Sequence, residues 1–309
     1  MSQLLALVEV LVIFLVIILI GWLLRKANVV SIQAKHDMNT LMMMVTLPAM
    51  LIGGFLQPFD KSLTEKGLLI ALLTVAALTI CFLVGFLFMK IFKVKPNRQG
   101  VWLLVSTFSS LGFMGFPVIE KMFGKEGLFL ASFVQIPYGP CFFFFGALMM
   151  TQTQVTKTIS LRKILLTPVM VAIDIGLVLY FLQVKPPAFV TSLLSIVGSM
   201  TGPLAMLIIG MALSEFPLIN IFNSFSLYKL SFVRLLAAPF IVALVLRLLP
   251  TTGNALLIPV LVIICAMPGP SNATNMAVTY GGDTDFAAKV TALSAILSLV
   301  TLPIVFLIL

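Results

Sequence analysis

The sequence predicts an all-α integral membrane protein with ten transmembrane helices in two inverted five-helix repeats, with broken crossover helices four and nine. Three observations lead to this fold class. Hydrophobic residues fill 61% of the 309 positions and charged residues only 9%, against about 25% charged residues in soluble domains. The apolar residues form ten runs, and the second half of the chain repeats segments of the first. This composition excludes soluble enzymes, disordered chains and disulfide-stapled secreted domains.

The ten apolar runs are bounded by charged or turn residues, and each is close to the roughly 20 residues that cross a bilayer. The first is too long for the apolar part of a signal peptide, so we expect it to remain as a span. The predicted spans are residues 4–24, 38–57, 67–92, 99–122, 127–151, 163–183, 190–214, 227–249, 255–280 and 285–308.

An internal repeat relates the two halves of the chain. Ala-Met-Leu-Ile at 49–52 recurs at 205–208, and Gly54 and Gly210 keep the same offset of 156. A second match, at an offset of 157, relates the segment that begins with Phe123 to the one that begins with Tyr280. Since each half holds five spans, an odd number, the second half must enter the membrane from the opposite side, as in many secondary transporters.

The longest polar stretch, residues 151–163, lies between spans five and six. We therefore expect the first five-helix repeat over residues 1–152 and the second, inverted repeat over residues 153–309.

Basic residues predict the orientation in the cell membrane. Twelve of the 19 Lys and Arg lie in loops on the side reached after span one, six lie on the other side, and Arg234 lies within span eight. Basic loops stay in the cytoplasm, so we expect a multi-pass protein with both termini extracytoplasmic. The net charge of +9 thus reflects topology, and no basic stripe with interleaved aromatic residues indicates nucleic acid as a partner.

Spans four and nine carry glycine and proline inside their apolar stretches, and Gly112 and Gly269 correspond at the offset of 157. A helix break inside a membrane survives where it lines a protein cavity. One such break alone is more simply an ordinary kink, but a matched pair beside polar residues points to a substrate site at the bilayer midplane. The candidate substrate-binding residues are Ser109, Ser110, Gly112, Gly115, Pro117, Pro268, Pro270, Ser271, Asn272 and Asn275.

Broken helices place half-helix ends at mid-membrane. N-terminal ends favour anions and C-terminal ends favour cations, so the pattern predicts an ion-handling site without fixing the sign of the substrate. An anion there would regain hydrogen bonds from the hydroxyl and amide side chains and from backbone N–H groups near Gly115 and Ser271.

Two charged residues within spans are candidates for a charge or coupling role. Arg234 is either a counter-charge for a carboxylate substrate or a side chain that extends to the cytoplasmic headgroups. Asp174, near the middle of span six, is either a proton or cation site or a structural group bonded to a neighbouring hydroxyl.

The sequence lacks the motifs of the enzyme and metal sites that we considered. The single histidine, His36, has no partner in a metal motif, and the three cysteines lie in apolar runs, so we expect neither a metal nor a cofactor. Tyr-Gly-Gly-Asp at 280–283 differs in glycine register from the Gly-x-Gly-Asp of intramembrane aspartyl proteases, and no Tyr-Asp motif accompanies it. No Gly-x-Ser-x-Gly element is present either, so we expect no enzyme.

Several motifs resemble the auxin efflux carrier family, whose bacterial members include malate or malonate permease-like proteins. They are Leu-Pro-Ala-Met-Leu at 47–51, Gly-Phe-Met-Gly-Phe-Pro at 112–117, Met-Pro at 267–268 and Tyr-Gly-Gly-Asp at 280–283. The resemblance implies a bile-acid sodium symporter-like crossover fold and an elevator mechanism. Spans one, two, six and seven would form the scaffold, and spans three to five and eight to ten the mobile transport domain.

The resemblance also implies a carrier of a small organic anion, a malate-like carboxylate or an auxin-like acid, with a proton or sodium as a possible coupling ion. A channel-like or substrate-sensing protein of the same fold is the alternative, and an intramembrane hydrolase a more remote one. We expect a homodimer in which span two, span seven or both form the interface, because Gly54 and Gly210 allow close helix approach; packing within one protomer is the other use of these glycines. The sequence departs from the family at Ser110, where Asn is frequent, and in span three, which has no acidic residue like that of the plant carriers.

The orientation can be tested by cysteine labelling from each side of the membrane. A single cysteine placed within residues 153–162 should react with a membrane-impermeant reagent only from the cytoplasmic side, because this loop lies on the more basic side. Reaction from the outside alone would reverse the predicted topology.

Overall fold

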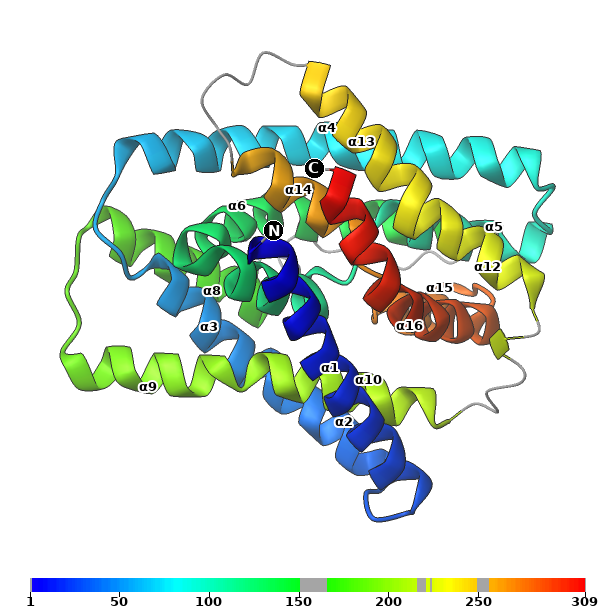
Figure 1. Cartoon of the computed structure of the whole chain (residues 1–309), viewed down its shortest axis with the longest axis horizontal. Coiled ribbons are helices and arrows are strands. Elements are labelled where there is room, and N and C mark those ends of the chain that lie inside the picture. Colours follow the sequence, from blue (N-terminus) through cyan, green and yellow to red (C-terminus); the bar gives the residue numbers. More distant parts are fainter. Residues whose placement is uncertain (1, 151–165, 216–220, 223, 249–255, 309) are drawn as a thin grey trace. The chain divides into compact units, whose positions relative to one another are not determined.

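The computed structural model describes residues 2–150, 166–215, 221–222, 224–248 and 256–308, and every regular element within these ranges is a helix (Figure 1). The chain divides into two compact units. Unit 1 consists of Met1–Ala71, Gly112–Ile136 and Leu161–Glu215, and unit 2 of Leu72–Leu111, Pro137–Ser160 and Phe216–Leu309. The predicted loop 153–162 and the predicted repeat boundary at 152–153 lie outside the described residues.

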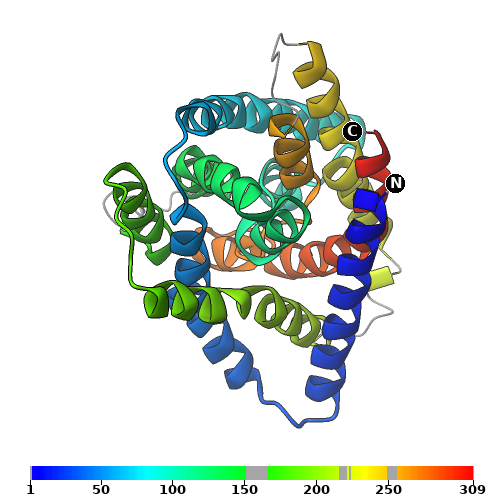
Figure 2. The ribbon, with the colours of Figure 1, turned by 60° about the vertical axis from the view of Figure 1, so that its left-hand side comes forward.

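Unit 1 contains the helices of predicted spans one, two, six and seven, together with the start of α4 and the first part of α6. In it α3 packs against both α8 and α9, and α1 packs along α10 (Figure 2). Its elements are α1 (Ser2–Lys26), α2 (Ile32–Leu41), the π-helix η1 (Met42–Thr46), α3 (Leu47–Phe55), α8 (Pro168–Phe181), α9 (Ala188–Ser199) and α10 (Thr201–Leu213).

Unit 2 contains most of α4 (Lys61–Ile91), the end of α6 (Phe116–Met150) and the helices after residue 216. In it α16 packs against α12, α14 and α15. Its further elements are α5 (Pro96–Thr107), α12 (Phe225–Phe232), the π-helix η3 (Val233–Ala237), α13 (Ala238–Leu248), α14 (Leu257–Ala266), α15 (Ala273–Tyr280) and α16 (Thr284–Ile308).

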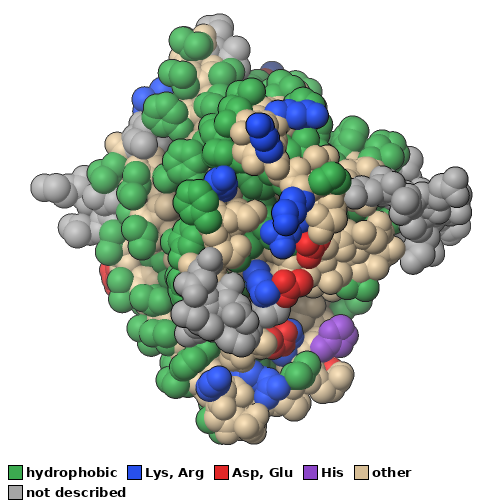
Figure 3. Space-filling model, turned by 90° about the vertical axis from the view of Figure 1, so that its right-hand side faces the viewer, with side chains coloured by type: hydrophobic (Ala, Val, Ile, Leu, Met, Phe, Trp, Pro, Cys, Tyr) green, Lys and Arg blue, Asp and Glu red, His purple; other side chains and the backbone are tan. Residues whose placement is uncertain are grey.

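Seven stretches of the described chain are long and apolar enough to cross a membrane, and α8 and α14 are shorter apolar helices. One of the seven, Pro96–Met150, is 55 residues long and takes in predicted spans four and five. Hydrophobic side chains cover much of the face in Figure 3, as expected for a protein that lies in lipid. The all-helical membrane class agrees with the sequence, whereas the arrangement of ten helices in inverted repeats remains a prediction.

Two helices begin about six residues before the predicted spans because polar caps start them. Ser31 accepts a hydrogen bond from the backbone N–H of Ala34 at 3.1 Å, so α2 begins at Ile32. The Asp60 carboxylate accepts from the N–H groups of Ser62 and Leu63, so α4 begins at Lys61. Such caps satisfy the free N–H groups of the first helical turn, and hydropathy alone does not locate them.

The junction between predicted spans four and five, residues 123–126, contains a break in the helical backbone. The break is at Gly124, where φ is 61° and ψ is −154°, and it divides α6 into two helical parts. Gly281, which ends α15, also has a positive φ, of 82°. These two glycines lie 157 residues apart, the offset of the second sequence match, and both need the backbone freedom of glycine.

The glycines offered as a dimer interface pack inside the protomer. A Cβ at Gly210 would overlap the carbonyl oxygen of Ile18 in α1, and a Cβ at Gly54 would lie 2.8 Å from Leu128 in α6. The expectation that these two glycines bring two protomers together is therefore wrong, because their open sides are already filled by helices of unit 1.

The close approach of α10 to α1 gives a testable consequence. Gly210→Ala should lower the free energy of unfolding by about 1–3 kcal/mol, because the added methyl group must displace backbone atoms. Thermal unfolding of the purified protein in detergent measures this.

Gly53→Ala is the matched control, since no atom lies within 4 Å of a Cβ at Gly53 and alanine favours a helix. Equal loss of stability in both variants would contradict the packing of α10 on α1.

Candidate functional site

Two helix breaks meet in unit 2. Helix α5 ends at Thr107 and α14 ends at Ala266, and the residue after each, Phe108 or Met267, is extended. Pro268 explains the second break, because a residue before proline disfavours helical geometry. The N–H of Ser110 donates to the carbonyl of Pro268 at 2.8 Å, so the two broken segments are bonded to each other.

Arg234 holds the carbonyl ends of both broken helices. Its Nε donates to the carbonyl of Met267 at 3.1 Å, and its Nη1 donates to the carbonyls of Ser106 at 3.1 Å and Thr107 at 3.2 Å. The side chain is 1% exposed and projects from the π-helix η3. A positive charge at two helix C-termini complements both helix dipoles.

This geometry bears on one of the two interpretations of Arg234. The side chain does not extend to the headgroups, because its guanidinium group is buried and bonded to three carbonyls. A further role of Arg234 as a counter-charge for substrate stays a prediction.

Two hydroxyl groups satisfy more of the freed backbone. The Tyr138 hydroxyl accepts from the N–H of Ser109 at 2.6 Å and donates to the carbonyl of the same residue. The Ser294 hydroxyl accepts from the N–H of Gly269 at 3.0 Å. Sequence reasoning missed both residues; the only signal for Tyr138 is that a buried tyrosine hydroxyl needs a partner.

Close packing fixes the second break. A Cβ at Gly269 would lie 2.9 Å from Cγ1 of Val105 in α5. Glycine is therefore required where the segment after α14 passes α5. This contact gives Gly269 a physical role that the sequence match alone does not supply.

The predicted binding residues differ in how much of their hydrogen-bonding capacity is used. Ser109 and Ser110 are buried, and the Ser110 hydroxyl lies 3.4 Å from that of Ser271. Ser271 and Asn272 are half-buried and Asn275 is exposed. Neither asparagine amide makes a side-chain hydrogen bond to another residue that the structure describes.

The asparagines lie at the start of a helix. Asn272 is the residue before α15, which begins at Ala273, and its side chain does not cap the helix. Asn275 is in the first turn. Free amide donors therefore lie at the positive end of α15.

The remaining predicted residues fall into two groups. Pro268 and Pro270 lie in the second break, with Ser271 and Asn272. Gly112, Gly115 and Pro117 belong to unit 1, where Gly112 and Gly115 are part of the π-helix η2 (Leu111–Gly115). The structure thus brings together in one unit only the serines of the first break and the residues of the second.

Asp174 lies on α8 of unit 1, with an exposed side chain. It has no ion pair with any described residue. Because a carboxylate on an apolar helix is costly in lipid, Asp174 stays a candidate for a coupling role.

The Tyr-Gly-Gly-Asp segment has a structural role. The Asp283 carboxylate accepts from the N–H of Phe286 at 2.9 Å, which caps α16. It also accepts from Nε of Arg98 at 3.1 Å. A carboxylate committed to a helix cap and an ion pair does not resemble half of an aspartyl protease dyad. Within the described chain, no three His, Cys, Asp or Glu residues gather in a group that could hold a metal.

Apolar helices with polar breaks inside them are a feature of membrane transport proteins. The chain belongs to the membrane transport protein family, whose model matches residues 6–155 and 149–306. It is 28% identical over 222 residues to an uncharacterized transporter of Methanocaldococcus jannaschii, covering 67% of this chain and 68% of that protein. It is 24% identical over 290 residues to an uncharacterized transporter of Methanothermobacter thermautotrophicus, covering 94% of each. These matches confirm that the chain belongs to a family of membrane transport proteins.

The bonds of Arg234 predict a large effect of its replacement. Arg234→Gln should lower the free energy of unfolding by about 3–5 kcal/mol, because buried carbonyls lose charged donors. Thermal unfolding in detergent measures the loss.

Arg247→Gln is the matched control, because Arg247 is exposed near the end of α13. The role assigned to Arg234 would be refuted if the two variants were equally stable.

Proposed function

We propose that this protein is a secondary transporter of a small organic anion, a malate-like carboxylate or an auxin-like acid. The observation that carries the proposal is the set of uncommitted donors at the positive end of α15. Ser271, Asn272 and Asn275 offer hydroxyl and amide groups there, and the two asparagine amides are free of bonds to described residues. A helix N-terminus with free donors favours an anion.

The electrostatics of the second break support the same sign of substrate. The negative ends of α5 and α14 are bonded to Arg234, whereas the positive end of α15 has no acidic residue in its first turn. An anion is the ligand that this uncompensated end favours. Neutral donors also allow release, since they do not form a buried ion pair with the substrate.

The bonds of Arg234 and the position of Asp174 favour a proton over sodium as the coupling ion. Arg234 bonds the carbonyl ends that would otherwise favour a cation, so we infer that sodium does not bind there. Asp174 is the candidate for proton coupling, because its carboxylate is exposed on an apolar helix without an ion pair among the described residues.

Elevator-type alternating access accounts for the proposed transport. The proposed scaffold, spans one, two, six and seven, supplies most of unit 1, and the proposed mobile domain supplies unit 2. Residues 61–71 and 112–136 are exceptions, since they belong to unit 1. A homodimer through the scaffold, in a cell membrane with both termini outside, completes the proposal.

Transport can be tested in proteoliposomes by counterflow of dicarboxylates and auxin-like acids, with and without a sodium or proton gradient. Saturable counterflow supports a carrier. Non-saturable flux would support the channel-like alternative, and binding without flux would support a sensor.

Within this assay, Asn272→Ala should raise the half-saturating substrate concentration about ten-fold, because one hydrogen bond to a charged acceptor is lost. Thr274→Ala is the control, since Thr274 lies two residues on, about 200° around the helix. If the well-folded Asn272→Ala and Ser110→Ala variants both transport like the parent protein, the site is not at these breaks.

A further inference from the structure

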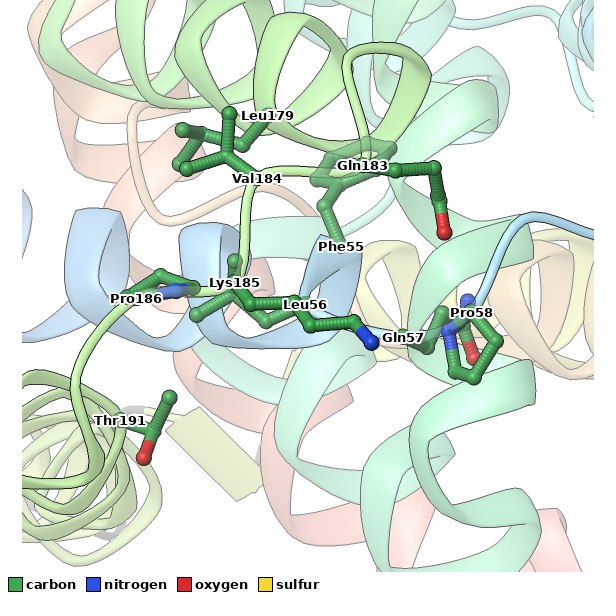
Figure 4. A pocket seen from close by; sticks show the side chains of 10 residues that line it. All are labelled: Phe55, Leu56, Gln57, Pro58, Leu179, Gln183, Val184, Lys185, Pro186 and Thr191. Atoms are coloured by element: carbon green, nitrogen blue, oxygen red, sulfur yellow. The ribbon is translucent and has the colours of Figure 1, made fainter.

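Unit 1 contains a pocket of about 330 Å³ whose lining residues all belong to this unit. It is formed where α3 and α8 end, by the segments that follow these helices (Figure 4). Its walls are mostly apolar, and its lining residues are Phe55, Leu56, Gln57, Pro58, Leu179, Gln183, Val184, Lys185, Pro186 and Thr191.

Hydrogen bonds hold the two segments in place. Gln183 accepts from the N–H of Phe59 at 3.0 Å and donates to the carbonyl of Tyr180 at 2.6 Å. The Tyr180 hydroxyl accepts from the N–H of Asp60 at 3.0 Å and lies 3.0 Å from the Thr64 hydroxyl. The pocket is therefore preformed, which lowers the entropic cost of binding a ligand.

Two donor groups at this pocket lack acceptors among the residues that the structure describes. Lys185 is exposed and makes no ion pair with a described residue, and its side chain extends toward Gln57 in Figure 4. Nε2 of Gln57 is buried without a hydrogen-bond partner in the described chain. The terminal torsion of glutamine is broad, so a small rotation turns this amide toward a ligand. A cation and an unpaired amide favour an anionic ligand rich in oxygen atoms.

The exposed apolar residues around the pocket favour a position at the edge of the bilayer. Large apolar side chains are exposed beside it, with 70% of Leu182, 45% of Val184 and 72% of Phe189 accessible. These side chains follow the end of the apolar helix α8 or begin α9. These exposed apolar side chains do not stabilise a bound soluble anion, whereas they can pack against an acyl chain.

We propose that this pocket binds an anionic phospholipid, with its phosphate group on Lys185 and Gln57 and an acyl chain along Leu182, Val184 and Phe189. The positive charge selects for anionic over zwitterionic headgroups, and the apolar rim selects for a lipid over a free phosphate ester. The proposal does not rest on the proposed transport site, since it uses none of that site's residues.

The test uses the purified full-length protein in detergent, with native mass spectrometry of phosphatidylglycerol and phosphatidylcholine binding. Phosphatidylglycerol should bind more tightly, and Lys185→Gln should weaken its binding about ten-fold through loss of a charged donor. Lys121→Gln, at another exposed lysine of unit 1, should change the affinity less than two-fold.

Equal binding of both lipids, or equal losses in the two lysine variants, would overturn the proposal. Glycerol phosphate serves as a second probe; if it competes with phosphatidylglycerol at similar concentration, the site binds a soluble anion and the lipid assignment is wrong. As an independent measurement, brominated phosphatidylglycerol should quench the fluorescence of Val184→Trp more than brominated phosphatidylcholine does. Equal quenching by both would also count against the site.

Discussion

The structure of unit 2 depends on the bonds of one buried guanidinium group. Breaking α5 and α14 inside an apolar environment frees carbonyl groups that water cannot reach, and each unpaired carbonyl is costly. Arg234 satisfies the carbonyls of Ser106, Thr107 and Met267 together. The arginine in turn requires the carbonyls, because a buried charge without partners is even less favourable than an unpaired carbonyl. The two costs offset each other only where both helix ends meet.

The hydrogen bonds of the other freed backbone groups support the proposed position of the substrate site. Tyr138 bonds both backbone groups of Ser109, and Ser294 bonds the N–H of Gly269. These bonds belong to the architecture of the breaks. The amides of Asn272 and Asn275 are different, since they have donors and acceptors to spare among the described residues. Unbonded side-chain amides beside backbone groups that are already hydrogen-bonded are the feature on which we base the proposed binding site.

Much of the fold followed from hydropathy and from glycine and proline positions, whereas the contacts did not. The apolar runs locate the helices, and Pro268 with its neighbours locates the break after α14. The early starts of α2 and α4 depend on the caps Ser31 and Asp60, which hydropathy does not register. The partners of Arg234 are 127 and 128 residues away in α5, so no local pattern reveals them. A glycine such as Gly210 allows close helix packing either within a protomer or between protomers. Only the position of Ile18 shows that Gly210 packs within the protomer.

The two helix breaks share backbone features, whereas the buried charge beside them is single. Gly124 and Gly281 share positive φ at an offset of 157 residues, and both α5 and α14 end in an extended residue. The residue 157 positions before Arg234 is Ala77, so the first half has no equivalent cation. One guanidinium group suffices because the two carbonyl ends lie together, within reach of Nε and Nη1 of the same side chain. The bonds of a single arginine thus connect the two helix breaks of unit 2.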